Sequence, residues 1–391
     1  MSTELAPCIA VIGPANSGKT SLLDLLDEAL QQDDAAPLVY VVKANPDGSA
    51  RYAHNTPDMR NREKGQWTPE TIGTSIGWIR SARKHLEIVL VDVGGNRKGA
   101  ALEGNLRLFR ECTHYLVLAR HFTDPAEERE KGMEAWAADA EQAGLKPFAR
   151  IVSTIKVGDP SFDPASRTGL FRGDAGHPRD TLNIPLVDAL TASLMSDLRL
   201  QRDSPQYFDL RRRHFWRETD LPALGGKLGA LQDALGVADD ILLGGSAPIF
   251  AYAAAFHAAL DQKPGATIRI FDPKVPSGQV VIPLAGYSGT AQPIPQDVLK
   301  LDWITEPILI LKFTAATQDR FFGSDVIENL ASLTVPDPPQ SLQGAAVEVN
   351  GSGPIWLHLT LSNWLRSRDT GRIGHWDAGL KRVVWVWPLS R

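Results

Sequence analysis

Short apolar runs alternate with amphipathic stretches along the first 155 residues of the chain. We expect strands at the apolar runs Cys8–Ile12, Leu38–Val42, Leu86–Val91, Tyr115–Ala119 and Ala149–Ile155. The stretches between them predict helices over Lys19–Gln31, Pro69–Lys84, Ala100–Glu111 and Ala126–Ala143. Strands that alternate with helices are typical of a parallel sheet with helices on its faces. The fold class predicted for this part is α/β.

A glycine-rich turn lies between the first predicted strand and the first predicted helix. It matches G-x-x-x-x-G-K-[ST] through Gly13, Pro14, Ala15, Asn16, Ser17, Gly18, Lys19 and Thr20, and Ser21 follows as a further nucleotide-binding candidate. The glycines let backbone N–H groups turn around phosphate oxygens, and the helix N-terminus adds its positive dipole. Lys19 would reach the β and γ phosphates, and Thr20 would ligate Mg²⁺. Because the motif stands between a strand and a helix, it predicts an NTP-binding loop rather than an ordinary turn.

The third predicted strand leads into Asp92-Val93-Gly94-Gly95. This position suits Asp92 for a Mg²⁺ contact, and the D-x-x-G spelling suits Gly95 for sensing a γ-phosphate through its backbone N–H. Lys19 and Asp92 are therefore the catalytic candidates for NTP hydrolysis, with Thr20 and Asp92 as the metal ligands. No Glu follows Asp92, and no clear N-K-x-D guanine motif is present, so ATP and GTP both stay open as the nucleotide.

Cations near the expected phosphates come from two places. The polar segment Asn45–Thr71 is typical either of a lid over the phosphates or of a solvated loop. Its cationic candidates are Arg51, Arg60, Arg62 and Lys64. Arg97 and Lys98 lie two and three residues beyond the D-x-x-G turn. They are the better candidates for stabilising transition-state charge.

Composition narrows the function classes. The 391 residues carry 46 acidic and 41 basic side chains, and this net charge of −5 argues against a protein that coats long nucleic acid. No apolar run is long enough to cross a bilayer, and the opening residues lack a signal-peptide pattern. Two cysteines, Cys8 and Cys112, are too few for a disulfide framework. We expect a soluble cytoplasmic protein without a membrane partner.

The back of the chain contains an internal repeat. The turn Gly245–Phe250 (Gly-Ser-Ala-Pro-Ile-Phe) recurs as Gly351–Trp356 (Gly-Ser-Gly-Pro-Ile-Trp), an offset of 351 − 245 = 106 residues. Each copy continues through a helix-length segment to an aromatic-Asp pair, at Asp272 and Asp377, where the offset is 377 − 272 = 105. Each unit reads strand, turn, helix, strand, Asp-bearing turn, strand. The N–H groups of such a turn can cradle a phosphate, although the turn can also simply start a helix.

The repeat sets the predicted domain boundaries. At about 150 residues per domain, the length indicates two or three domains. We predict a P-loop NTPase domain over residues 1–160, an Arg-, Asp- and Pro-rich connector over 161–220, and two modules over 221–288 and 289–391.

Both parts of the chain resemble one known family. The turn Gly351–Trp356 and the pair Trp376-Asp377 are similar to motifs of the type III CRISPR-associated ring nucleases. Lys64–Glu70 and Asp92–Gly95 resemble the AAA-type P-loop module that is fused to that family. The resemblance implies two tandem ferredoxin-like modules in a pseudo-dimer. It also implies that they bind cyclic oligoadenylate, the second messenger of this antiviral defence.

The resemblance also places the ligand. The implied effector-binding residues are Gly245, Ser246, Pro248, Lys274, Gly351, Ser352 and Pro354. Asp272 and Asp377 take the catalytic-turn position for phosphodiester cleavage, for which Mn²⁺ would be a further cofactor. The family's Arg after this Asp is Lys274 in one copy and Gly379 in the other, and its helix-end His is displaced. Cleavage therefore stays open, whereas binding is expected. His257 and His375 are displaced candidates or packing residues.

Three functions follow as hypotheses. The leading one is an accessory protein of type III CRISPR signalling that binds, and in a further step degrades, cyclic oligoadenylate while its front domain hydrolyses ATP or GTP with Mg²⁺. The second is a P-loop kinase that phosphorylates a small molecule or an RNA end. The third is a non-catalytic scaffold that the nucleotide stabilises. Assembly into a homo-oligomer is left open.

Overall fold

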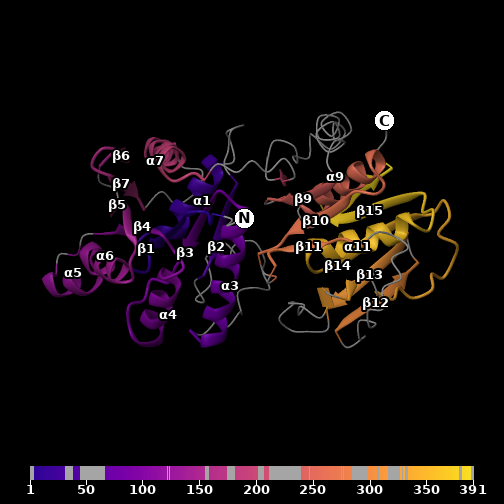
Figure 1. Cartoon of the computed structure of the whole chain (residues 1–391), viewed down its shortest axis with the longest axis horizontal. Coiled ribbons are helices and arrows are strands. Elements are labelled where there is room, and N and C mark those ends of the chain that lie inside the picture. The colour runs from indigo at the N-terminus through magenta and orange to yellow at the C-terminus, as the bar shows by residue number, and fades with distance from the viewer. Residues whose placement is uncertain are drawn as a thin grey trace. The chain divides into compact units, whose positions relative to one another are not determined.

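The chain forms two compact units, Met1–Asp203 and Ser204–Arg391, which are described separately (Figure 1). This computed structural model describes residues 4–30, 38–44, 67–120, 122, 124–154, 158–173, 181–200, 207–210, 239–245, 247–273, 275, 277–283, 298–305, 308–315, 326–327, 329–330, 333–377 and 381–388. Among these residues, the longest apolar helices still fall short of what a bilayer crossing requires.

The front unit is built on a seven-stranded sheet in the order β2-β3-β1-β4-β5-β7-β6. Its strands are β1 (Cys8–Ile12), β2 (Val39–Lys43), β3 (Ile88–Asp92), β4 (His114–Ala119), β5 (Lys146–Thr154), β6 (Ser161–Asp163) and β7 (Thr168–Arg172). Its helices are α1 (Lys19–Leu30), α3 (Pro69–His85), α4 (Gly99–Phe109), α5 (Pro125–Lys131), α6 (Met133–Gln142) and α7 (Ile184–Asp197), with a 3-10 turn at Thr181–Asn183. Neighbouring strands are parallel, except for the antiparallel pair β6/β7. The α/β class predicted for the front is confirmed.

Helices cover this sheet on two sides. In Figure 1, α1 and α7 lie together on one side, and α3 and α4 lie on the other. Every residue of β1 and β3 is buried, as expected of parallel strands that are covered on both faces. The leucines of α1 and α7 pack with the strands in one apolar cluster.

Two expectations about the front unit were wrong. The described residues between 161 and 200 are not a connector, because β7 pairs in parallel with β5 and α7 packs on α1. The Asn183 side chain joins the 3-10 turn to the end of β7, because it accepts from the N–H of Arg172 and donates to its carbonyl. The single helix expected over Ala126–Ala143 is split into α5 and α6 at Gly132, whose extended backbone (φ −67°, ψ 173°) interrupts the helical path.

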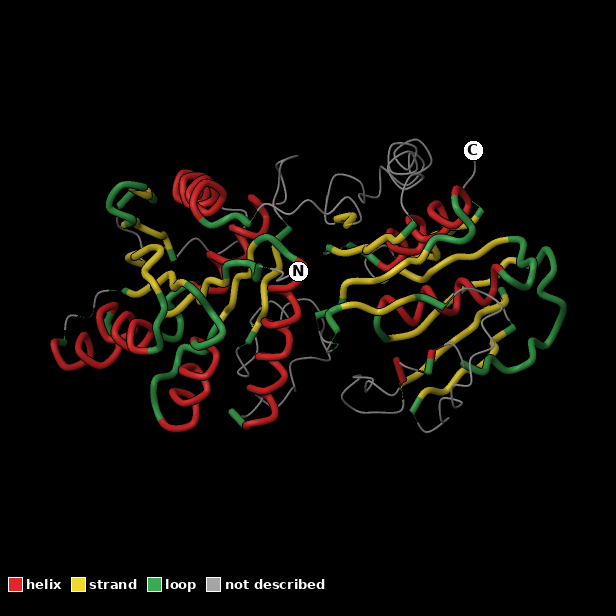
Figure 2. Tube along the Cα trace, viewed as in Figure 1, coloured by secondary structure: helices red, strands yellow, loops and turns green. Residues whose placement is uncertain are grey.

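The back unit contains two sheets, with orders β11-β10-β9-β8 and β12-β13-β14-β15-β16. The first group of elements is β8 (Tyr207–Asp209), β9 (Asp240–Gly244), α9 (Ile249–Gln262), β10 (Thr267–Phe271) and β11 (Gln279–Val281). The second is β12 (Leu299–Ile304), β13 (Leu309–Ala315), β14 (Ala346–Ser352), α11 (Ile355–Arg366), β15 (Arg372–Asp377) and β16 (Arg382–Trp387). Figure 2 shows the helices against the strands of this unit.

The structure bears out the repeat strand by strand. In each copy a parallel pair is followed by the crossover helix, a second parallel pair and an antiparallel last strand. Ile241 pairs with Ile268 in the first copy, and Val347 pairs with Ile373 at the matching positions of the second. β8 is the counterpart of β13, so the first module includes a strand that we had assigned to the connector. The boundary at residue 221 was therefore wrong.

The ferredoxin-like expectation for these modules does not match their sheets. The described strands follow one another in chain order, with two adjacent parallel pairs in each sheet. A ferredoxin-like βαββαβ unit interleaves its strands instead. The resemblance rested on turn residues, and turn residues do not determine strand order.

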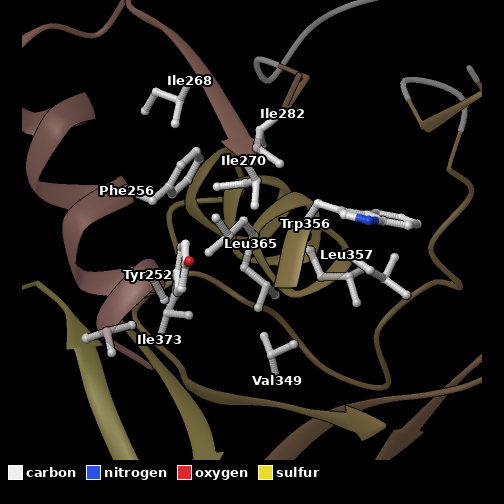
Figure 3. Packing of buried hydrophobic residues seen from close by; sticks show 14 of the residues in the cluster. Tyr252, Phe256, Ile268, Ile270, Ile282, Val349, Trp356, Leu357, Leu365 and Ile373 are labelled. Carbon is white, nitrogen blue, oxygen red and sulfur yellow. The ribbon is translucent and has the colours of Figure 1, made fainter. Parts of the chain in front are cut away.

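The two copies share one core. Tyr252 and Phe256 of α9 lie in the same apolar cluster as Trp356, Leu357 and Leu365 of α11 (Figure 3). Polar contacts also join the copies, among them the bond from Asn363 Nδ2 to the Pro283 carbonyl at 2.7 Å and the ion pair of Arg366 with Asp261 at 2.7 Å. The copies are therefore halves of one folded unit, as the predicted pseudo-dimer requires.

Three buried histidines lie in this shared core. The Nδ1 atoms of His358 and His375 are 3.3 Å apart, and His375 Nε2 lies 2.8 Å from Ser362 Oγ. Both ring nitrogens of His257 are buried without a hydrogen-bond partner among the described residues. Burial lowers the pKa of His257 to about 3 and of His358 to about 4, and it lowers the pKa of His375 well below its usual range. All three histidines are neutral in the folded protein at pH 7.

These pKa values predict a pH-dependent stability. The unfolded chain binds protons at its histidines near pH 6.5, whereas the folded core does not, so stability falls as the pH drops below about 6.5. From pH 7 to pH 5, His257 alone should cost about 2 kcal/mol. Urea unfolding followed by tryptophan fluorescence should show a smaller loss for His257→Leu than for the wild type. An equal loss in both proteins would contradict this account.

Candidate functional site

The P-loop occupies the connection from β1 to α1, where its sequence requires glycine. Gly13 has φ 142° and Gly18 has φ 92°, a region that other residues rarely adopt. A Cβ on Gly13 would stand 1.9 Å from the Leu118 carbonyl oxygen, because β4 runs directly beside β1. Asn16 also takes a left-handed conformation, with φ 60°. Residues with positive φ let a short loop curve around an anion and turn its N–H groups toward it.

Lys19 starts α1 with its ammonium folded over this loop. Its Nζ donates to the carbonyls of Gly13 at 2.9 Å and Pro14 at 2.8 Å. Burial lowers the pKa of Lys19 to about 8, and the charge of nearby Asp92 opposes this shift. At pH 7 the side chain is therefore still mostly protonated, as phosphate binding requires.

Thr20 and Asp92 come together from α1 and β3. Thr20 Oγ1 donates to Asp92 Oδ2 at 2.9 Å, and the other carboxylate oxygen is buried without a partner among the described residues. Burial raises the pKa of Asp92, while the Thr20 hydrogen bond and the charge of Lys19 act against the increase. A hydroxyl and a carboxylate oxygen with an unfilled bond fit a Mg²⁺ ion, which usually takes one or two protein ligands together with phosphate oxygens and water.

The D-x-x-G turn lies against the P-loop. The Ala15 N–H donates to the Gly95 carbonyl at 3.1 Å, and a Cβ on Gly95 would stand 2.4 Å from Ala15 N. Asn105 of α4 holds the turn by donating to the carbonyls of Gly94 at 3.1 Å and Asn96 at 3.0 Å. No sequence motif singled out Asn105, because its role depends on where α4 packs.

Arg97 and Lys98, the two predicted transition-state cations, are paired with acidic side chains. Arg97 Nε donates to Asp139 at 2.6 Å, its guanidinium also bonds the Glu130 carbonyl, and it lies 5.8 Å over the Trp136 ring. Lys98 pairs with Glu130 at 2.6 Å. The lid candidates Arg51, Arg60, Arg62 and Lys64 lie outside the described residues. The described residues at the end of that segment lead into α3, and Thr68 caps the first turn of this helix.

The two repeated turns of the back unit begin α9 and α11 in the same way. Pro248 and Pro354 are the N-cap residues, one position before the first helical residue, with φ −67° and −70°. Gly245 has φ 103°, and the Tyr252 hydroxyl donates to its carbonyl. A Cβ on Gly351 would stand 2.6 Å from Phe313. Ser246 and Lys274 lie outside the described residues, and for Ser352 only the backbone, at the end of β14, is described.

Asp272 lies beside the turn of the other copy. Trp356 Nε1, from the start of α11, donates to Asp272 Oδ2 at 3.2 Å. Phe250 is the repeat-equivalent of Trp356 and has no N–H to offer Asp377, which ends β15. His257 and His375, the displaced acid-base candidates, are both fully buried in the shared core. They cannot reach a ligand at the turns in this conformation.

A cavity of about 230 Å³ adjoins the P-loop. Its lining includes Pro14, Ala15, Gly95, Arg120 and Phe122. Arg120 was not a sequence candidate, although it directly follows β4 at the sheet edge where the P-loop begins. Among the described residues, no group of three or more His, Cys, Asp or Glu side chains could hold a metal ion without further ligands.

Comparisons with known proteins assign the chain to no family. No protein-family model matches the chain, and no curated protein matches it. One solved structure that is similar is chloroplast FtsY from Physcomitrella patens, with 16% identity and a TM-score of 0.26. That match covers 51% of this chain and 59% of the FtsY chain. A likeness this weak carries no argument about activity.

The contact between Gly95 and the P-loop predicts a specific defect. Gly95→Ala would push its methyl group into Ala15, so the turn must move away from the phosphates, and NTP turnover should fall at least tenfold. Gly77→Ala is the matched control, since Gly77 lies in α3 and a Cβ there meets nothing within 4 Å. Phosphate release at saturating nucleotide measures both variants. Wild-type turnover in Gly95→Ala would show that the turn does not act on the nucleotide.

Proposed function

We propose that the front unit binds and hydrolyses ATP or GTP with Mg²⁺ and that the back unit binds cyclic oligoadenylate. The observation that carries the first part is the arrangement of Lys19, Thr20 and Asp92 around a loop whose backbone favours glycine at Gly13 and Gly18. We propose a P-loop NTPase domain that does not belong to the AAA subclass. β1 and β3 are direct neighbours, whereas an AAA-type sheet has a further strand between them.

Different residues of the front unit would bind the metal ion and the phosphates of the nucleotide. Thr20 and Asp92 would hold Mg²⁺, which supplies charge neutralisation at the β and γ phosphates. The N–H groups of the loop and the Lys19 ammonium bind phosphate oxygens and orient the chain of phosphates. Gly95 would present its N–H to the γ-phosphate from the facing turn. Because Asp92 and Lys19 are buried, their charges act with little screening by solvent.

The pairing of the repeated copies supports the second part. A cyclic ligand with internal symmetry suits a pocket built from two equivalent halves, and here both halves belong to one folded unit. The bond from Trp356 to Asp272 links the ligand-binding turn of one copy to the Asp-bearing turn of the other. We further propose that Asp272 or Asp377 cleaves the ligand with Mn²⁺, and measuring the breakdown of cyclic oligoadenylate tests this step.

Two alternatives are separated by the fate of the γ-phosphate. Wild-type protein with γ-labelled ATP or GTP should release the label as free phosphate, and Lys19→Ala should abolish the release because its ammonium contacts the phosphates. Label transferred to an acceptor would favour the kinase. Nucleotide binding without any turnover would favour the scaffold.

The bond between the two copies predicts a change in affinity. Trp356→Phe keeps the ring but removes the donor to Asp272, so cyclic tetra-adenylate should bind roughly three- to tenfold more weakly, the range expected for one hydrogen bond. Trp364→Phe is the matched control, because Trp364 lies on the same helix and packs near Trp303 instead. Isothermal titration measures both.

The outcome also tests the ligand itself. No heat from cyclic tri-, tetra- or hexa-adenylate with the folded wild type would overturn the effector assignment. Equal affinity of Trp356→Phe and wild type would show that the bond from Trp356 to Asp272 does not contribute to ligand binding.

A further inference from the structure

The cavity beside the P-loop lies where a γ-phosphate would end. Pro14 and Ala15 form one wall, and Gly95 and Asn96 of the facing turn form another. Under the proposed nucleotide-binding function, on which this inference rests, the γ-phosphate lies beside the cavity that these two segments line together. A side chain that lines the same cavity is therefore close to the group being transferred.

Sheet register brings Arg120 to this place. β4 runs parallel to β1, with Val117 opposite Ile12, so the next residue, Leu118, stands against Gly13. Arg120 follows two residues later, as the chain leaves the same edge of the sheet. Its guanidinium lies 4.9 Å over the ring of Phe122, whose N–H is fixed by Glu128 Oε2 at 2.8 Å. The ring supports the guanidinium without neutralising it.

The other cations of the cavity are already paired. Arg97 bonds Asp139, Lys98 bonds Glu130, and Lys131 bonds Glu127 at 2.9 Å. For Arg120, by contrast, the described part of the chain provides no carboxylate within ion-pair distance. The Lys19 ammonium bonds the carbonyls of Gly13 and Pro14 and is not among the residues that line this cavity. Arg120 is thus the cavity's available guanidinium.

We propose that Arg120 is a catalytic residue that stabilises the negative charge on the γ-phosphoryl group during hydrolysis. In this step a new bond joins the water oxygen to the γ-phosphorus. The bond from phosphorus to the bridging oxygen breaks, and the nucleoside diphosphate keeps that electron pair. One water proton stays on the released phosphate, and the other passes to solvent. The planar guanidinium can bond two equatorial oxygens at once, which a lysine ammonium does less well.

The test compares chemistry with binding. Arg120→Ala should lower single-turnover hydrolysis of Mg²⁺-ATP or Mg²⁺-GTP at least 100-fold, while affinity for a fluorescent nucleotide changes less than about threefold. Arg120→Lys should recover only part of the rate. Arg129→Ala is the matched control, because Arg129 lies exposed on the neighbouring helix α5 and does not line the cavity. It should leave the rate unchanged.

A second measurement keeps the outcomes apart. Wild type with a nucleoside diphosphate and aluminium fluoride, which imitates the transition state, should form a stable complex, and Arg120→Ala should not. If hydrolysis and complex formation both survive in Arg120→Ala, the assignment of Arg120 is wrong and the proposed NTPase stands. If the wild type binds nucleotide but gives neither hydrolysis nor the complex, the catalytic role is overturned together with the proposed hydrolysis.

Discussion

Strand β1 is hydrogen-bonded in parallel on both of its edges, to β3 and to β4, and the site of the front unit depends on this constraint. Parallel neighbours end at the same edge of a sheet, so the P-loop, Asp92 and Arg120 leave three adjacent strands at one place. The strands are so close that Gly13 tolerates no side chain against Leu118. The glycine pattern of the P-loop is thus a packing requirement of the sheet as well as a means of binding phosphate.

Burial gives the same site its electrostatic character. Lys19 and Asp92 are both buried, and burial shifts the pKa of each toward its neutral form. The charge of each group opposes the pKa shift of the other, and Thr20 donates a hydrogen bond to Asp92. Keeping both groups charged therefore requires neighbours of opposite charge. A phosphate chain with a bound divalent cation supplies both signs, so a site organised in this way gains more from such a ligand than an exposed site would.

The sequence alone predicted the parts of the fold whose signal is local. The P-loop, its flanking strand and helix, and the registers of the repeat all follow from short patterns that the structure reproduces. Prediction from the sequence failed for elements that depend on partners far away along the chain. β7 is a short strand with a glycine that forms by pairing with the edge of β5, and β8 is defined by its pairing with β9. Arg97 is well placed by spacing, yet its charge is paired with that of Asp139, which is remote in sequence. Pairings of that kind need coordinates.

Fusion of the two copies into one chain lets their equivalent positions diverge, which identical subunits of a dimer cannot do. Tyr252 of the first helix bonds its own turn at Gly245. The repeat-equivalent His358 also bonds the backbone of its own turn, at Gly351, but its ring lies in addition against that of His375. The arginines Arg366, Arg368 and Arg372 each lie over a tryptophan of the second copy, at 5.3, 5.2 and 4.6 Å. This accounts for part of the tryptophan concentration near the C-terminus. With Trp356 bonded to Asp272 and Phe250 unable to make the matching bond, a symmetric ligand would meet two unequal halves. Within the described residues, the turn of Asp272 is tied to the helix start of the other copy through a tryptophan N–H, and Phe250 cannot make the same bond to Asp377, so the two turns need not act alike on such a ligand.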